Sequence, residues 1–314
     1  MRKLIGLAIV GLIAQLVDGA LGMGYGVTST SLLLIAGLTP AAASASVHLA
    51  ELGTTLVSGI SHHKFGNVDW GLTIRLGIPG AVGAFLGATL LSRLSTESAT
   101  PVMAGLLFVL GAFLLTRFVR VAGHAQVLKP GKLPTGFLTP LGLVGGFVDA
   151  TGGGGWGPVS TTTLLVVGRT KPRTVVGSVD TSEFLVTIFA SLGFLLGLGT
   201  AGINLGFVAA LLLGGLVAAP IAAWLVSRLP SAVLGTGAGA LIVVTNLRTL
   251  LKNFGVSADV RATVLATVGA TGALLVAIAV QRHRARVLRE RRDEALLAGS
   301  LDSLTAPEQA GTPA

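Results

Sequence analysis

One glycine-rich segment occurs twice in this chain, and each copy interrupts a long hydrophobic stretch. At an offset of 131, residues 18–34 align with residues 149–165, and eight of the seventeen positions are identical. Two shorter blocks recur in the same order, 46–51 as 178–183 and 92–94 as 227–229. Three blocks in one order at nearly equal gaps indicate an internal repeat.

The composition predicts a membrane protein. Of 314 residues, 52% are hydrophobic and only 11% are charged, with a mean hydropathy of +0.83, which is too little charge to cover a soluble surface. The net charge of +9 lies in loops and one tail, so we expect no nucleic-acid partner. The chain has no cysteine, which excludes disulfides and thiolate metal sites, and we expect no metal and no cofactor.

Each glycine loop divides its hydrophobic stretch into two arms. The arms are 4–17 and 27–37 in the first copy, and 135–148 and 158–168 in the second. Arms of 14 and 11 residues reach only about 21 and 16 Å, less than the bilayer core of about 30 Å. We therefore predict two re-entrant hairpins of broken helices. Their glycine turns must be buried in protein or line a wet cavity, because unpaired backbone groups in lipid are costly.

The remaining hydrophobic stretches predict full spans. They lie at 41–61, 71–92, 101–119, 174–197, 205–227, 232–251 and 262–281. The predicted fold is an all-α polytopic membrane protein with two inverted repeats, each a hairpin plus three transmembrane helices, and one extra C-terminal span. The predicted parts are a first repeat (1–119), a basic cytoplasmic linker (120–134), a second repeat (135–251), an additional transmembrane helix (252–281) and a basic, then disordered, cytoplasmic tail (282–314).

The distribution of Lys and Arg favours re-entrant hairpins. With re-entrant hairpins one side of the membrane holds 15 of the 22 basic residues and the other holds 6, whereas hairpins that cross would split them 11 to 10. Cytoplasmic loops carry the excess of Lys and Arg, so the C-terminal tail is expected in the cytoplasm. Arg2 and Lys3 fall on the outer side and count against this topology.

The second arm of each hairpin begins with the residues of an anion site. Pro158 and the hydroxyl residues after each loop are typical of a helix start, where unpaired N–H groups and the macrodipole attract negative charge. Two such starts at the midplane are the arrangement that secondary transporters use. Tight helix packing is the alternative explanation of the glycines. The candidate binding residues are Gly22, Gly24, Gly26, Thr28, Ser29, Thr30, Gly153, Gly155, Gly157, Ser160, Thr161 and Thr162.

Ionisable residues inside the membrane form a second, repeated set. Asp18 and Asp149 precede the two glycine loops, and Glu51 and Glu183 are equivalent in the later block. His48 and Asp180 lie three residues earlier on the same helical faces. Ionised carboxylates would repel an anion, so we predict that these six residues act in coupling or gating, with protons or another coupling ion. The alternative is structural: the aspartates would cap backbone N–H groups and the glutamates would bond a neighbouring helix.

Three other polar residues carry weaker hypotheses. Arg75 is expected to snorkel to the interface, with steering of the anion as its alternative role. His62 and His63 lie in a predicted loop, where a solvated surface is a better explanation than a metal site.

Several motifs resemble the TauE/SafE sulfite exporter family of bacterial membrane transporters. They are D-G-A-L-G-M-G-Y-G (18–26), T-P-A-A-A-S-A-S-V (39–47), H-K-F-G-N-V-D-W (63–70), G-G-G-G-W-G-P (152–158) and S-V-D-T-S-E (178–183). The resemblance covers about residues 4–251. It implies transport of sulfite, sulfoacetate or related anions, generally outward across the bacterial cytoplasmic membrane. The span at 262–281 and the arginine-rich tail look like additions to the family plan.

These observations predict a secondary transporter, an exporter of a small anion such as sulfite or another sulfur oxyanion or sulfonate, with alternating access and proton coupling. A passive anion channel is the alternative, and it would never carry its solute beyond electrochemical equilibrium. An intramembrane enzyme would need a positioned nucleophile and base. His48 is the single histidine in a predicted span, and no G-x-S-G-type loop accompanies it, so we expect no enzyme.

Overall fold

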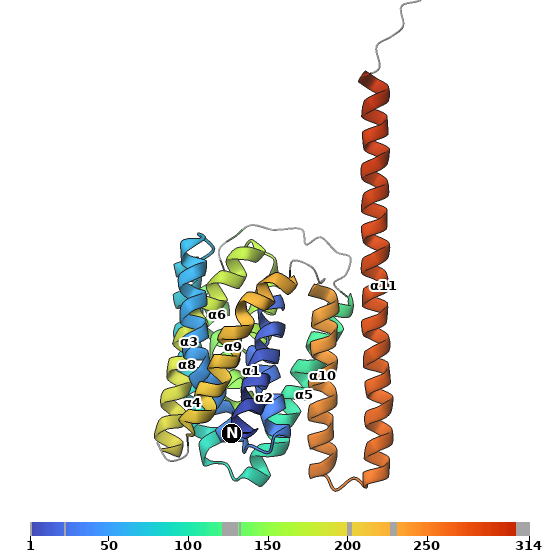
Figure 1. Ribbon diagram of the computed structural model, residues 1–314. Helices are drawn as coiled ribbons and strands as arrows, with labels where there is room; N and C mark the ends of the chain where they lie inside the picture. Colours follow the sequence, from blue (N-terminus) through green and yellow to red (C-terminus); the bar gives the residue numbers. More distant parts are fainter. Residues whose placement is uncertain are drawn as a thin grey trace, which may run out of the picture.

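The protein is a bundle of helices with one long helix at its flank (Figure 1). The computed structural model describes residues 2–21, 23–120, 131, 133–199, 203–226 and 231–305. No strand occurs within these ranges. Gly22, most of the predicted basic linker, and residues 306–314 of the predicted tail lie outside the described residues.

The chain forms its helices in the following order. They are α1 (Arg2–Leu21), α2 (Tyr25–Ile35), α3 (Pro40–Lys64), α4 (Trp70–Arg93), α5 (Thr96–Arg120), α6 (Thr135–Gly152), the π-helical turn η1 (Gly157–Thr161), α7 (Thr162–Val167), α8 (Pro172–Leu198), α9 (Leu205–Val226), α10 (Ser231–Asn253) and α11 (Ala258–Thr305). Each predicted span coincides with one of these helices.

The helices make this a polytopic membrane protein. Among the described residues, five helices are long and apolar enough to cross a membrane, namely α4, α5, α8, α10 and α11. The helix α3 is 25 residues long but is not one of the five. It carries His48, Glu51 and several hydroxyl residues, so its interior-facing side is polar. The prediction of an all-helical, multi-pass membrane protein is confirmed at this level.

Each glycine loop is the turn of a helical hairpin. The start of α1 lies beside the end of α2, because Lys3, Leu7 and Val10 line one pocket with Gly37 and Leu38. In the second half, a Cβ on Gly145 of α6 would lie 2.9 Å from the Ser160 hydroxyl oxygen of η1. The second arm therefore folds back along the first in both copies.

The first arms are longer than the sequence analysis predicts. They comprise 20 residues in α1 and 18 in α6, about 30 and 27 Å, against the 14 residues expected. The prediction was wrong because it ended each arm before the aspartate, whereas Asp18 and Asp149 lie inside the helices. The second arms keep the expected length, since α2 has 11 residues and residues 157–167 form η1 and α7.

Glycines let each first arm pack tightly against a helix of the other half. A Cβ on Gly11 of α1 would lie 2.2 Å from the Leu211 carbonyl oxygen of α9, and one on Gly146 of α6 would lie 2.0 Å from the Gly80 oxygen of α4. The helices touch backbone to backbone, as small residues permit in membranes. The two halves therefore exchange their hairpins, and each half completes the other.

The last helix continues beyond the predicted span. The tail at 282–314 is predicted to be basic and then disordered, whereas α11 runs without a break for 48 residues to Thr305. The segment after the span is rich in Ala, Leu, Arg and Glu, the residues with the highest helix propensity, which explains the continuation. In Figure 1 this extension rises well beyond the bundle.

The close contact of α4 and α6 predicts that a side chain added at Gly146 strongly lowers the stability of the fold. Gly146→Val places its side chain inside the Gly80 carbonyl contact and should destabilise the fold by about 1–3 kcal/mol or more through overpacking. The control is Gly105→Val in α5, where a Cβ meets nothing within 4 Å. Thermal unfolding of both purified variants in detergent tests this, and equal melting temperatures would contradict the packing.

Candidate functional site

The two hairpin turns meet each other inside the bundle. A Cβ on Gly26 would lie 2.6 Å from the Gly154 Cα, and one on Gly154 would lie 2.1 Å from the Val27 nitrogen. The Thr30 hydroxyl donates a hydrogen bond to the Gly153 carbonyl. Gly153 and Gly154 have φ of 67° and 142°, which only glycine adopts readily. The turns therefore touch through their backbones, and no side chain fits between them.

An aspartate caps the second arm in both hairpins. The Tyr25 N–H donates to Asp18 Oδ1 at 3.2 Å, and the Trp156 N–H donates to Asp149 Oδ1 at 2.9 Å. In each copy the acceptor lies seven residues before the donor, so the interaction repeats with the sequence. The structural alternative for these aspartates, the capping of backbone N–H groups, is thus observed at both positions.

The second oxygen of Asp149 binds a histidine from the first half. Asp149 Oδ2 lies 3.1 Å from His48 Nε2, and His48 Nδ1 lies 2.8 Å from the Ser44 carbonyl oxygen. A carbonyl can only accept, so Nδ1 carries a proton, and one further proton lies between Nε2 and the carboxyl group. The His48 side chain is fully buried and that of Asp149 is 2% exposed. The pair is therefore neutral as a whole while it holds this proton.

The equivalent pair in the first half consists of two carboxyl groups. Asp180 occupies the repeat position of His48, and it is close enough to Asp18 for the two charges to interact. Its Oδ2 is buried without a hydrogen-bond partner in the described structure. The nearest base is His62 of α3, whose Nε2 lies 3.8 Å away, too far for a hydrogen bond. The two halves thus share a backbone plan but differ in charge.

Two glutamates complete the cluster at the hairpin turns. Glu51 is 3% exposed, its Oε1 faces Gly26, and its Oε2 has no hydrogen-bond partner in the described structure. Glu183 interacts electrostatically with Glu51 and with all three aspartates. The sequence-predicted coupling residues are therefore gathered at one place. Within the described residues, no group of three or more His, Asp or Glu is arranged to hold a metal ion.

Two hydroxyls near the turns are buried without any partner. Thr28 and Ser160 are both fully buried, and neither the Thr28 Oγ1 nor the Ser160 Oγ has a hydrogen bond in the described structure. Each lies within the first turn of its second arm. Buried hydroxyls are almost always bonded, so a pair of free ones at equivalent helix starts points to a ligand.

The other predicted binding residues take part in the fold around the turns. The Ser29 hydroxyl bonds its own helix at Tyr25, and Gly24 caps α2 with a φ of 116°. Thr161 is buried, and Gly155 and Gly157 pack against Val148 and Met23 respectively. Pro158 is the second residue of the π-helical turn η1, a departure from the α-helix that often marks functional sites.

Two polar residues at the site were missed in the sequence. Arg117 of α5 donates to the Thr162 hydroxyl, and Asn246 of α10 donates to the Ser31 hydroxyl at 2.8 Å. Ser31 and Thr162 are equivalent positions of the repeat. Arg117 lies within the predicted span 101–119, but the sequence pattern assigns it no role at the site. The expense of a charge inside the membrane was the signal that could have singled it out.

Arg75 lies away from this cluster. Its Nε donates to the Gly71 carbonyl at 2.7 Å and its Nη1 donates to the Leu133 carbonyl at 2.9 Å. These carbonyls belong to the beginning of α4 and the residues just before α6, so the guanidinium reaches toward the end of the span, as a snorkelling side chain does.

Comparison with known proteins assigns the chain to a family. Residues 7–249 match the family described as Sulfite exporter TauE/SafE. The chain belongs to the TauE/SafE family. The matched range contains both hairpins and ends within α10, so α11 lies outside the TauE/SafE match.

Two curated relatives of this TauE/SafE chain come from Bacillus subtilis (strain 168). The "Probable membrane transporter protein YtnM" is 49% identical over 270 residues, which cover 86% of this chain and 90% of that protein. The "Probable membrane transporter protein YdhB" is 27% identical over 218 residues, 69% of this chain and 86% of that protein. No solved structure matches. Family and relatives indicate a membrane transporter rather than an enzyme.

The His48–Asp149 pair predicts strong coupling between two substitutions. His48→Leu leaves the Asp149 carboxylate buried without its partner and should destabilise the protein by about 3–5 kcal/mol. Asp149→Asn should then cost much less in the His48→Leu background than alone, because no ion pair remains to be broken. Unfolding of the single and double variants in detergent measures this coupling.

His63→Leu is the matched control, since His63 is exposed at the end of α3 and lies outside this pair. It should leave stability almost unchanged. Additive effects of His48→Leu and Asp149→Asn would show that the two side chains are not coupled.

Proposed function

We propose that this chain is a secondary transporter that exports a small anion across the bacterial cytoplasmic membrane, with sulfite or another sulfur oxyanion or sulfonate as its substrate. The observation that carries this proposal is the pair of buried, unpartnered hydroxyls of Thr28 and Ser160, one at the start of each second arm, where the two hairpin turns meet.

Hydroxyl and backbone donors suit an oxyanion. The helix starts at Tyr25 and Gly157 add the positive ends of two helix dipoles to these hydroxyls. Arg117 brings a guanidinium to the second hairpin through its bond to Thr162. An oxyanion has several acceptor oxygens, so it can take hydrogen bonds from both hairpins at once. The family description supports a sulfur oxyanion over other anions.

The carboxyl groups at the turns supply the coupling to protons. Five carboxyl groups and one imidazole lie around the turns, namely Asp18, Glu51, Asp149, Asp180, Glu183 and His48. A second negative charge is costly beside ionised carboxylates in a low-dielectric site. The anion therefore binds best when these groups hold protons, and an anion and at least one proton move together. Asp18 and Asp180, neither of which is hydrogen-bonded to a histidine among the described residues as Asp149 is, are the first candidates to carry the transported proton.

Two inverted repeats that rock about the turns would give alternating access. The exchanged hairpins and the matched aspartate caps support this arrangement, because each half contributes one hairpin to the other. In Figure 1 the N-terminus lies at the end of the bundle opposite the extension of α11. The arginine-rich extension marks that side as cytoplasmic by the excess of positive charge.

Loss of either free hydroxyl should weaken anion binding without harming the fold. Thr28→Val and Ser160→Ala each remove a buried oxygen that has no hydrogen bond to the described residues, so the melting temperature of the ligand-free protein should stay the same or rise. Sulfite raises that temperature by binding the native state. The sulfite concentration for the half-maximal shift should increase about tenfold or more in each variant, as expected for a lost bond to a charged ligand.

Thr267→Val is the control for the hydroxyl variants, because Thr267 is exposed on α11 and bonds its own helix. Sulfate, thiosulfate, sulfoacetate, taurine and simple carboxylates should be screened in the same way. A wild-type protein that shows no shift with any anion at millimolar concentration would refute the proposed oxyanion site.

Proton coupling predicts uptake driven by a pH gradient. Acidification of the side that holds the anion should protonate the cluster and accelerate flux into proteoliposomes, and accumulation should exceed electrochemical equilibrium. Asp180→Asn should retain downhill flux but lose this accumulation, whereas Asp259→Asn, at the start of α11, should not. Sulfoacetate is the probe in this experiment, because it forms no neutral gas that could cross the lipid without the protein. Accumulation that never exceeds equilibrium would assign a passive channel instead.

A further inference from the structure

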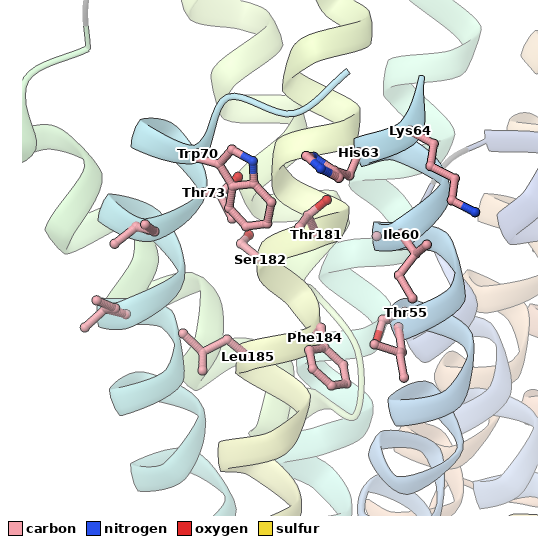
Figure 2. Close-up of a pocket in the computed structure, with 14 residues that line it drawn as sticks. Thr55, Ile60, His63, Lys64, Trp70, Thr73, Thr181, Ser182, Phe184 and Leu185 are labelled. Carbon is pink, nitrogen blue, oxygen red and sulfur yellow. The ribbon is translucent and has the colours of Figure 1, made fainter. Parts of the chain in front are cut away.

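A groove lies on the outer flank of the bundle, away from the hairpin turns. It has a cavity volume of about 550 Å³ and lies between α3, α4 and α8. Figure 2 shows Ile60 and Thr55 projecting from α3, Trp70 and Thr73 from α4, and Phe184 and Leu185 from α8. Leu56, Ile60, Ile74 and Ile78 line it and are all 44–54% exposed. The groove therefore opens toward the lipid along much of its length.

The hydroxyl groups along its wall are already bonded. The Thr55 hydroxyl donates to the Glu51 carbonyl at 2.6 Å, the Thr181 hydroxyl to the Gly177 carbonyl at 2.6 Å, and the Ser182 hydroxyl to the Val179 carbonyl at 2.6 Å. Thr73 bonds the Ser178 carbonyl at 3.2 Å. A hydrophilic anion would find no free hydroxyl donor along this wall, and the remaining donors, on His63, Lys64 and Trp70, lie together at one end of the groove. An extended hydrocarbon chain needs none, and it covers apolar side chains that otherwise face the bilayer.

One end of the groove has the character of a membrane interface. Trp70 begins α4 and His63 and Lys64 end α3, and Figure 2 shows all three at the same end. The rings of His63 and Trp70 pack edge to face with centroids 5.5 Å apart. Tryptophan and lysine favour the level of the lipid headgroups. Asp69, the acid beside them, is engaged in capping α4 through the Leu72 N–H at 3.0 Å.

We propose that this groove binds one anionic phospholipid, with an acyl chain between α3, α4 and α8 and the headgroup phosphate beside Lys64. Charge complementarity selects the anionic lipid, since the lysine lies at the end of the groove where the phosphate of a seated chain would lie. Two of the three helices that line the groove, α3 and α8, also carry Glu51, Asp180 and Glu183. Thr181 and Ser182 lie on α8 between Asp180 and Glu183, and Thr55 lies one turn after Glu51.

The groove has a closed floor. Gly59 of α3 packs on Thr181 of α8, with a Cβ position 3.5 Å from the Thr181 Cα, so α3 and α8 are in contact beside the groove. A chain seated here would lie on the outer side of this contact, between α3 and α4.

The test is native mass spectrometry of the full chain with added phosphatidylglycerol or phosphatidylcholine of the same acyl chains. One phosphatidylglycerol should remain bound to the wild type. Ile74→Trp, which fills the groove, should abolish it, and Lys64→Gln should weaken it about fivefold, the effect of one surface lysine on an anionic lipid. Leu86→Trp is the control, because Leu86 is 54% exposed on the same helix but outside the groove.

Any of three results would overturn the proposal. Equal retention of phosphatidylcholine and phosphatidylglycerol, or equal loss in Ile74→Trp and Leu86→Trp, would show ordinary contact with surrounding lipid. Displacement of phosphatidylglycerol by millimolar sulfite would assign the groove to the transported anion. The melting temperature of each variant in detergent shows that it is folded, and Lys64→Gln, at an exposed position, tests the headgroup contact without filling the groove.

Discussion

The backbone contact between the two glycine turns sets the rest of the structure. Gly26, Val27 and Gly154 approach so closely that any side chain at either glycine would displace the opposite turn. Irregular backbone inside a membrane protein has N–H and C=O groups that lipid cannot satisfy. The bundle must therefore surround the turns with protein. It does so through α3 and α8, which carry buried polar side chains, and through the aspartates that cap the second arms.

The repeat supplies a symmetrical frame, and the charges break its symmetry. Both aspartates accept a bond from the first N–H of a second arm, but Asp149 also holds His48 whereas Asp18 faces Asp180. One half thus has its countercharge within the protein. In the other half, the nearest base among the described residues is His62, 3.8 Å from Asp180 and beyond hydrogen-bond distance. On the proposed mechanism, Asp18 and Asp180 gain and lose a proton during transport, whereas the His48–Asp149 pair keeps its proton.

The sequence predicted those features that follow from repetition and hydrophobicity. The helices at the seven predicted spans and the two hairpins depend on the order of apolar runs and on glycine. All seven helices occur, and five of them are long and apolar enough to cross a membrane within the described residues. The arm lengths were wrong because a helix can include an aspartate when that side chain turns back to cap the next helix. Arg117 and Asn246 were missed because their partners, Thr162 and Ser31, lie far away in the chain. Only the packing of α5 and α10 beside the hairpins brings them there.

The charge of the cluster also explains why export of an anion would require a proton. A charge that crosses the low-dielectric interior is expensive, so the empty and the loaded transporter should both be close to neutral at the turns. When an anion with one negative charge binds at Thr28, Ser160 and the helix starts, one positive charge must then be added to keep the site neutral. Arg117 and the His48–Asp149 pair are present in both states and cannot supply the difference. A proton taken up by the unpaired carboxyl groups can, and its release after the anion leaves would return the site to its starting charge.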